Sequence, residues 1–305
     1  METQISEFTF DTSHLDSIIK LGSTYYPSNY QGLKQSYLNW FYGNNPNGPA
    51  SLIVAHEDNS WIGLIVLIPI ILHYKQQEQK ACFAVNVLTH PEHRAKNLFV
   101  KMISFAKANL IKRGIWILGH PNANAIPGWK RHKMDFRESL HPYLIKFNTP
   151  LSNKKIKKIK INSIEQLQRL PKSFWEIEKK STKVSIVYSP EFIAWRFLNA
   201  TDTQYKIILI EMNGVPIGLK ITRRFKLLFD LVVDFIPVKP EYSSYAGLLA
   251  NFFQFDIIAL SRDSHLTKFC WQLPVKKNIP FFLTTFKNDI QDLDASNITM
   301  SATDF

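Results

Sequence analysis

Two basic side chains stand between a strand pattern and a helix pattern, where they could bind phosphate. The apolar run 84–89 is followed by Pro91, then by Arg94 and Lys96, and apolar positions at a helical spacing begin at Leu98. The first turn of a helix carries unpaired backbone N–H groups and the positive end of the helix dipole, so it attracts phosphate oxygens. The segment therefore predicts a site for a phosphate-bearing ligand.

The same segment resembles motif A of the GNAT acyltransferases, whose usual form is close to Pro-Glu-His-Arg-Gly-Lys-Gly-Leu-Phe. Residues 91–99 follow that form, with Ala95 and Asn97 at the two glycine positions. Alanine is a small departure, and asparagine tolerates left-handed backbone. The resemblance implies that acyl-CoA binds with its pyrophosphate on 93–98 and its pantetheine along the preceding strand. The alternative is an ordinary surface turn with two solvated cations. The residues implied in cofactor binding are Val87, Leu88, Thr89, His93, Arg94, Ala95, Lys96, Asn97, Leu98, Asn122 and Trp129.

The implied reaction is attack of an amine on a thioester, and its candidate catalytic residues are Asn86, His120 and His132. Backbone N–H groups at an irregularity in the strand at Asn86 would stabilise the oxyanion. His120 follows the strand 115–119, which in GNAT folds diverges from the motif A strand and leaves room for the thioester. The position of the family's tyrosine general acid is not filled by tyrosine here, and His132 and Tyr143 are candidates to replace it. Asn86 could instead be hydrogen-bonded by neighbours, and His120 could simply cap a strand end.

The absence of acidic residues from the motif A strand indicates the kind of amine that accepts the acyl group. Residues 81–90 contain no carboxylate that could act as a strong base. An amine near the α-amino reference pKa of ~8 is partly neutral at pH 7, whereas a lysine amine near ~10.4 needs more help. The sequence thus favours a weakly basic amine.

An internal repeat gives the chain its organisation. The same number of residues separates Trp40 from Trp195 as separates Ile62-Gly63-Leu64 from Ile217-Gly218-Leu219, and apolar strands precede both tripeptides at 51–55 and 206–210. We expect the two tryptophans to be structural anchors. The second copy has Ser243-Ser244-Tyr245-Ala246 in place of the cationic turn, which predicts a single CoA site in the first copy.

These observations predict an α/β (α+β) protein of two tandem GNAT-like domains, each with a mixed, mostly antiparallel central sheet flanked by helices. The expected domains are 1–150, with motif A, and 151–305, a degenerate copy that shapes the acceptor site. A chain of 305 residues with 45% hydrophobic content is long enough for two cores.

The composition of the chain limits the classes of binding partner and the cellular compartment that we expect. The net charge of +12 includes lysines at 154–160 and suits either nucleic acid or polyanionic small molecules such as CoA. No nucleic-acid-binding motif supports the first, so no nucleic-acid partner is expected. Apolar runs such as 61–72 are shorter than the roughly 20 residues of a membrane span, and no signal segment opens the chain. The cysteines, Cys82 and Cys270, favour the reducing cytoplasm and form no metal motif, so no metal is expected.

The whole chain resembles bacterial GNAT sugar N-acyltransferases, which implies transfer of an acetyl or hydroxyacyl group from CoA to a nucleotide-linked (dTDP) amino-deoxy sugar in surface polysaccharide biosynthesis, including lipopolysaccharide. Two alternatives stay open: acyl or aminoacyl transfer to a peptide or cell-wall precursor amine, and a non-catalytic CoA-binding scaffold.

Overall fold

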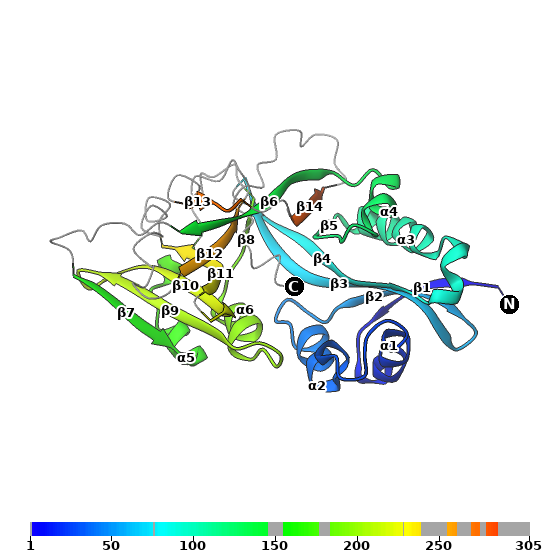
Figure 1. Cartoon of the computed structure of the whole chain (residues 1–305), viewed down its shortest axis with the longest axis horizontal. Helices are drawn as coiled ribbons and strands as arrows, with labels where there is room; N and C mark the ends of the chain where they lie inside the picture. Colours follow the sequence, from blue (N-terminus) through cyan, green and yellow to red (C-terminus); the bar gives the residue numbers. More distant parts are fainter. Residues whose placement is uncertain are drawn as a thin grey trace.

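The computed structural model describes residues 2–75, 77–145, 155–176, 184–227, 229–238, 255–260, 270–274 and 279–285. Within these residues, the strands form one continuous mixed sheet along the molecule (Figure 1). In spatial order it contains β1 Gln4–Thr9, β2 Ser51–Glu57, β3 Ser60–Tyr74, β4 Gln77–Thr89, β5 Trp116–Gly119, β14 Ile279–Thr284, β6 Phe136–Ile145, β12 Phe255–Leu260, β11 Phe229–Pro237, β10 Val215–Lys226, β9 Tyr205–Met212 and β7 Ile156–Ile161, while β8 Ser185–Ile186 pairs with β3 and β13 Cys270–Gln272 pairs with β6.

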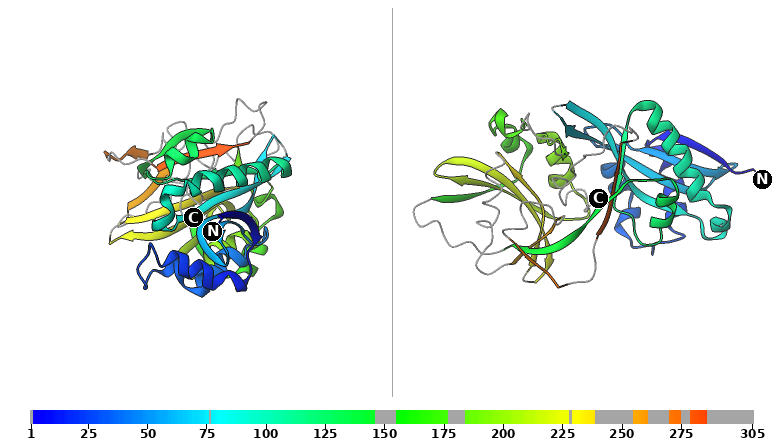
Figure 2. Two further views of the ribbon diagram at one scale, coloured as in Figure 1. Left: turned by 90° about the vertical axis from the view of Figure 1, so that its right-hand side faces the viewer. Right: turned by 90° about the horizontal axis from the view of Figure 1, so that it is seen from above.

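Helices cover both faces of the N-terminal half of the sheet (Figures 1 and 2). α3 Leu98–Arg113 and α4 Ile126–Arg131 lie on one face, and α1 Leu15–Gly22 and α2 Gln35–Leu38 lie on the other. No helix in the described ranges is both long and apolar enough to cross a bilayer. The remaining helical segments are α5 Ile164–Gln168, α6 Pro190–Ile193, the 3-10 turns η1 Thr12–His14, η2 Gln31–Leu33, η4 Pro91–Lys96 and η5 Lys172–Phe174, and the π-helical turns η3 Asn39–Gly43 and η6 Ala194–Leu198.

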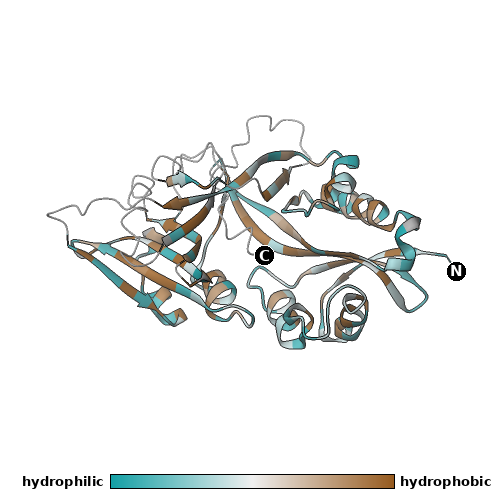
Figure 3. Ribbon diagram, in the orientation of Figure 1, coloured by the Kyte–Doolittle hydropathy of each residue, from teal (hydrophilic) through white to brown (hydrophobic). Residues whose placement is uncertain are grey.

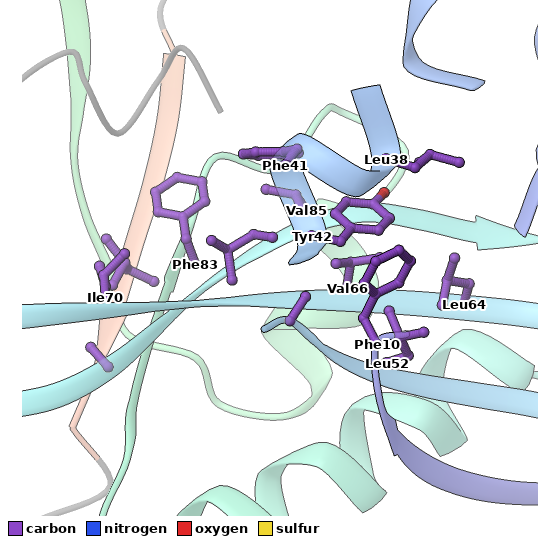
Figure 4. Packing of buried hydrophobic residues seen from close by; sticks show 14 of the residues in the cluster. Phe10, Leu38, Phe41, Tyr42, Leu52, Leu64, Val66, Ile70, Phe83 and Val85 are labelled. Atoms are coloured by element: carbon purple, nitrogen blue, oxygen red, sulfur yellow. The ribbon is translucent and has the colours of Figure 1, made fainter. Parts of the chain in front are cut away.

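Successive side chains along the strands point to opposite faces of the sheet, and this alternation divides the N-terminal core into two layers. On β2, Leu52 and Val54 join the cluster that contains α1 and α2 residues, whereas Ile53 and Ala55 join the cluster beneath α3. This period of two is what a strand covered on both faces requires. Figure 3 shows the resulting apolar bands on the strands, and Figure 4 shows Tyr42 of η3 packed above Val66 of β3.

The two halves repeat one strand arrangement. β2, β3 and β4 pair antiparallel and β4 pairs in parallel with β5, while β9, β10 and β11 pair antiparallel and β11 pairs in parallel with β12. The expected mixed, mostly antiparallel sheets are therefore confirmed. The expected strands at 51–55 and 206–210 lie within β2 and β9. The lysine-rich segment, compatible from sequence with a strand or a linker, forms the strand β7 beside β9.

The halves also share strands. β14, from the C-terminal part of the chain, lies between β5 and β6, and β6 pairs with β14 near its start and with β12 near its end. The division of the chain between residues 150 and 151 stays a prediction. The segment 243–246, predicted to replace the cationic turn in the second copy, lies outside the described residues.

Candidate functional site

β4 and β5 separate after a short parallel contact. Ala81–Phe83 pairs with Trp116–Leu118, but β4 continues to Thr89 while β5 ends at Gly119. The C-terminal half of β4 therefore departs from β5, as the resemblance implied. On its other edge β5 pairs with β14, and a Cβ atom built on Gly119 would come within 3.0 Å of the Phe282 ring. A side chain larger than hydrogen is excluded there unless the ring shifts.

β4 has a bulge at the expected irregularity. Val85 lies opposite Val66 and Leu88 lies opposite Leu64, so β4 has one extra residue between them. Asn86 sits in this bulge with a φ of 46°, a left-handed conformation that asparagine tolerates better than most residues. A bulge redirects backbone N–H groups away from the regular ladder, which is the geometry that an oxyanion-stabilising segment requires.

The Asn86 side chain bonds to the protein itself. Its amide donates a hydrogen bond to the hydroxyl of Tyr42 on η3. Burial raises the pKa of the Tyr42 hydroxyl far above its ordinary value, against the smaller opposing effect of the Asn86 hydrogen bond. Tyr42 is thus a neutral buried partner that fixes Asn86. This hydrogen bond fits the structural role that the sequence left open for the side chain, and a catalytic role of Asn86 stays a prediction. The backbone of the bulge is the candidate for oxyanion contact.

After the bulge, a tight turn connects β4 to α3. η4 runs from Pro91 to Lys96, and Asn97 follows with φ 54° and ψ 31° before α3 begins at Leu98. Asn97 stands at a glycine position of motif A, and glycine and asparagine both adopt this left-handed conformation readily. Asparagine therefore retains the backbone path despite the altered residue. Backbone 93–98 consequently lies at the N-terminus of a helix of 16 residues.

The two cations of the turn differ in their surroundings. Lys96 Nζ lies 2.6 Å from Glu57 Oε1, and Thr3 donates a 2.6 Å hydrogen bond to the same oxygen. The Lys96 and Thr3 hydrogen bonds hold the pKa of Glu57 at about 2. Arg94 is exposed, and its guanidinium carbon lies 5.3 Å from the centre of the Tyr25 ring. Lys96 is therefore partly neutralised by a carboxylate, whereas Arg94 presents its charge to solvent.

The end of β4 is held by an aromatic residue from a distant part of the chain. The hydroxyl of Tyr25 donates a hydrogen bond to the carbonyl of Thr89 and accepts one of 3.3 Å from the Thr89 N–H. Val87 and Thr89 are half-buried, whereas Leu88 is 5% exposed and joins the core. The role of Tyr25 has no signal in the sequence, because no local pattern relates it to Thr89.

His120 lies at the end of β5 in an apolar environment. Its Nδ1 is 3.0 Å from the carbonyl oxygen of Pro280, and its ring contacts Phe83 and Phe281. Burial lowers the pKa of His120 to about 4, although the Pro280 hydrogen bond opposes this effect. Its Nε2 is buried and has no hydrogen-bond partner within the described ranges. His120 is thus a neutral and weak base at pH 7.

The other predicted residues lie on or beside α4. The Oδ1 atom of Asn122 accepts a 3.0 Å hydrogen bond from Ala125 N–H in the turn before α4. Trp129 is 2% exposed and packs between Phe99 of α3 and Phe282 of β14. This packing gives Trp129 a core position and leaves its ring no open face for a cofactor.

His132 follows α4 and belongs to the same group. Its backbone carbonyl accepts a 2.8 Å hydrogen bond from Lys107 Nζ, and burial lowers its pKa while a hydrogen bond to the backbone of Val100 raises it. Both partners lie on α3. The structure therefore gathers the bulge and the turn at one end of β4, and it places His132, Asn122 and Trp129 with the outer helices.

Comparison with known proteins rests on structure. No protein-family model and no curated protein sequence matches this chain. A probable N-acyltransferase of unknown function from Enterococcus faecalis superposes with a TM-score of 0.64 at 10% identity, covering 93% of this chain and 72% of the other. A GCN5-related N-acetyltransferase from Kribbella flavida superposes with a TM-score of 0.65 at 10% identity, covering 92% and 71%.

A third solved structure has the tandem arrangement along its whole length. A tandem GNAT protein from the clavulanic acid biosynthesis pathway superposes with a TM-score of 0.54 at 9% identity, covering 94% of this chain and 100% of the other. At such identities the likeness establishes the fold alone. Together with the repeated strand arrangement, it shows that this chain has the tandem fold of the GCN5-related N-acetyltransferases.

Proposed function

We propose that this chain is an acyl-CoA-dependent N-acyltransferase whose CoA site is the turn between β4 and α3. One observation carries the proposal: a single continuous segment contains the bulge at Asn86, the left-handed Asn97 and the start of α3. The bulge redirects backbone N–H groups toward the place where negative charge develops on a thioester oxygen. The start of α3 supplies N–H groups and a positive dipole end for a pyrophosphate.

Arg94 is the side chain that best supports anion binding at this turn. It is exposed, whereas Lys96 shares its charge with Glu57. A cation next to a helix N-terminus strengthens the hold on phosphate through charge-assisted hydrogen bonds. The residues present fit a bound pyrophosphate, and Arg94 is the one whose removal has the largest expected effect.

In the proposed reaction, the protein has to position the two reactants and stabilise the negative charge on the thioester oxygen. Acyl-CoA supplies an activated carbonyl carbon. The acceptor nitrogen forms a C–N bond to that carbon, and the C–S bond breaks with its electron pair going to the sulfur, so that CoA leaves as a thiolate. The nitrogen loses its proton to water or to that thiolate. The bulge of β4 holds the oxygen, and alignment of the two reactants supplies much of the remaining rate enhancement.

The weakness of His120 as a base supports a weakly basic acceptor. A group with a pKa of about 4 is a poor acceptor for the proton of a lysine ammonium near ~10.4. We therefore propose an amine of lower pKa, and specifically the amino group of a nucleotide-linked amino-deoxy sugar. The resemblance to bacterial sugar N-acyltransferases supports the sugar, its dTDP carrier and a role in surface polysaccharide biosynthesis.

The two halves have different proposed roles. Residues 1–150 would bind acyl-CoA, and residues 151–305 would shape the acceptor site. The sequence at 243–246 supports this division, since it lacks the cations of the first copy. The proposal thus predicts one CoA per chain.

Release of free thiol from acetyl-CoA or 3-hydroxybutanoyl-CoA tests the proposed reaction. A dTDP-3-amino-3,6-dideoxyhexose should accelerate release well above the rate without acceptor, and a lysine-containing peptide should not. Acceleration by the peptide alone would replace the sugar with a peptide or cell-wall amine. If the chain binds CoA but neither class of amine releases thiol, the proposed enzyme activity is wrong and the alternative of a non-catalytic CoA-binding scaffold remains.

A further inference from the structure

Three potential metal ligands meet on the turn that follows β4. His90, Glu92 and His93 each offer one ligand atom, and these atoms all lie within 4.8 Å of one another. The two imidazole rings are perpendicular, with centres 5.5 Å apart. Among the described residues this is the one group of three or more such side chains at metal-binding separation.

The backbone of the turn explains why these side chains converge. His90 immediately precedes the 3-10 segment η4, and the N–H of His93 donates a 2.9 Å hydrogen bond to the His90 carbonyl. This hydrogen bond closes one turn of the chain and brings residues 90 and 93 close together. The two imidazoles therefore lie on one side of the turn, and Pro91 fixes the backbone between them.

The imidazole nitrogens of this group have bonding capacity left over. The Nδ1 atoms of His90 and His93 are buried and have no hydrogen-bond partner within the described ranges. For His93 Nδ1, Glu57 Oε1 lies 3.8 Å away, which exceeds hydrogen-bond distance. Unsatisfied buried nitrogens are costly, and a missing ion or water is a usual explanation. Both of these nitrogens belong to residues of the same cluster.

We propose that His90, Glu92 and His93 form a binding site for a divalent transition-metal ion of the zinc class. Imidazole nitrogen and carboxylate oxygen are the ligands that Zn²⁺, Co²⁺ and Ni²⁺ accept. Three protein ligands leave a coordination position for water or another ligand. The carboxylate of Glu57 also lies beside His93, where its charge is shared with Lys96.

The folded turn gives these residues a role that the sequence analysis did not anticipate, since it predicted no metal site. A metal ion would link the start of η4 to its middle and fix the turn before α3. The inference does not rest on the proposed acyltransferase function, because metal binding is measured without CoA.

Titration of the full, EDTA-treated chain with Zn²⁺ in a calorimeter tests the site. The wild type should bind one Zn²⁺ per chain. His90→Gln and His93→Gln should each weaken binding at least about tenfold, since even residues that only support ligands contribute 10- to 100-fold. His14→Gln is the matched control: His14 lies near Asp11 on η1, outside the cluster. It should bind like the wild type. Absence of binding, or equal binding in all four proteins, would overturn the site.

The absorption spectrum of the wild type with Co²⁺ tests the metal site even if a variant fails to fold. Co²⁺ bound by imidazole and carboxylate in a four-coordinate site should show visible absorption much stronger than that of hydrated Co²⁺. Added Zn²⁺ should abolish this absorption. A spectrum equal to that of the hydrated ion would contradict the proposal without reference to any variant.

Discussion

The indoles of Trp40 and Trp195 bond reciprocally, each to the backbone of the other residue. Trp40 Nε1 donates a 2.7 Å hydrogen bond to the Trp195 carbonyl, and Trp195 Nε1 donates a 2.8 Å hydrogen bond to the Trp40 carbonyl. Both side chains are buried, and they lie on the π-helical turns η3 and η6. Equivalent positions of the two copies thus contact one another, which confirms the predicted structural role of both tryptophans.

Trp40→Phe should lower the free energy of unfolding by about 1–3 kcal/mol, because it leaves the buried Trp195 carbonyl without its donor. Urea unfolding measures this loss. Trp61→Phe is the control, since Trp61 is half-buried and stacks on Phe8 at the edge of the core. A loss at Trp40 no greater than the loss at Trp61 would contradict the anchoring role.

Asn97 provides a test of the turn before α3. Asn97→Ala should destabilise the protein by about 1–2 kcal/mol, because alanine resists the left-handed conformation found at this position. Asn97→Gly should change stability by less than about 1 kcal/mol, since glycine adopts that conformation freely. Thermal unfolding of both variants measures the difference. If alanine and glycine were equivalent here, the turn would not have the geometry described.

His120 should make stability depend on pH in one direction. Its pKa in the folded protein is about 4, below the ordinary 6.5, so the unfolded chain binds the proton first as pH falls. The free energy of unfolding should therefore decrease as pH falls from 6.5 to 4, by on the order of 3 kcal/mol from this group.

His120→Gln should remove that contribution and flatten the profile. Urea unfolding at several pH values compares the variant with the wild type. His73→Gln is a useful second variant, because burial lowers the pKa of His73 as well and contributes in the same direction. A wild-type profile that matches that of His120→Gln would show that His120 titrates normally.

The local features of the site could be predicted from the sequence. The strand, the turn and the helix from Leu98 follow one another along the chain, so periodicity and turn chemistry indicate them directly. The irregularity at Asn86 is implied by the resemblance to the GNAT acyltransferases, and the structure has a bulge there. The strand expected at 115–119 is β5. The repeat also has a sequence signal, because Trp40 and Trp195 occupy matching places.

The contacts between distant segments could not be predicted in the same way. The hydrogen bonds from Tyr25 to Thr89 and from Asn86 to Tyr42 join segments that are far apart in the sequence, and no pattern in either segment indicates its partner. The position of β14 between β5 and β6 likewise depends on chain topology. Trp129 illustrates the consequence, since the ring assigned from sequence to the cofactor is covered by Phe282 of β14.

The central claim is that the turn between β4 and α3 binds CoA, and calorimetric titration of the full chain with CoA tests it most directly. The wild type should bind one CoA per chain, and Arg94→Glu should weaken binding at least about tenfold, because it reverses a charge beside the phosphates. Arg169→Glu reverses an exposed charge at the end of α5 and should bind like the wild type. Equal affinity in Arg94→Glu and the wild type, or no binding to either, would contradict the account.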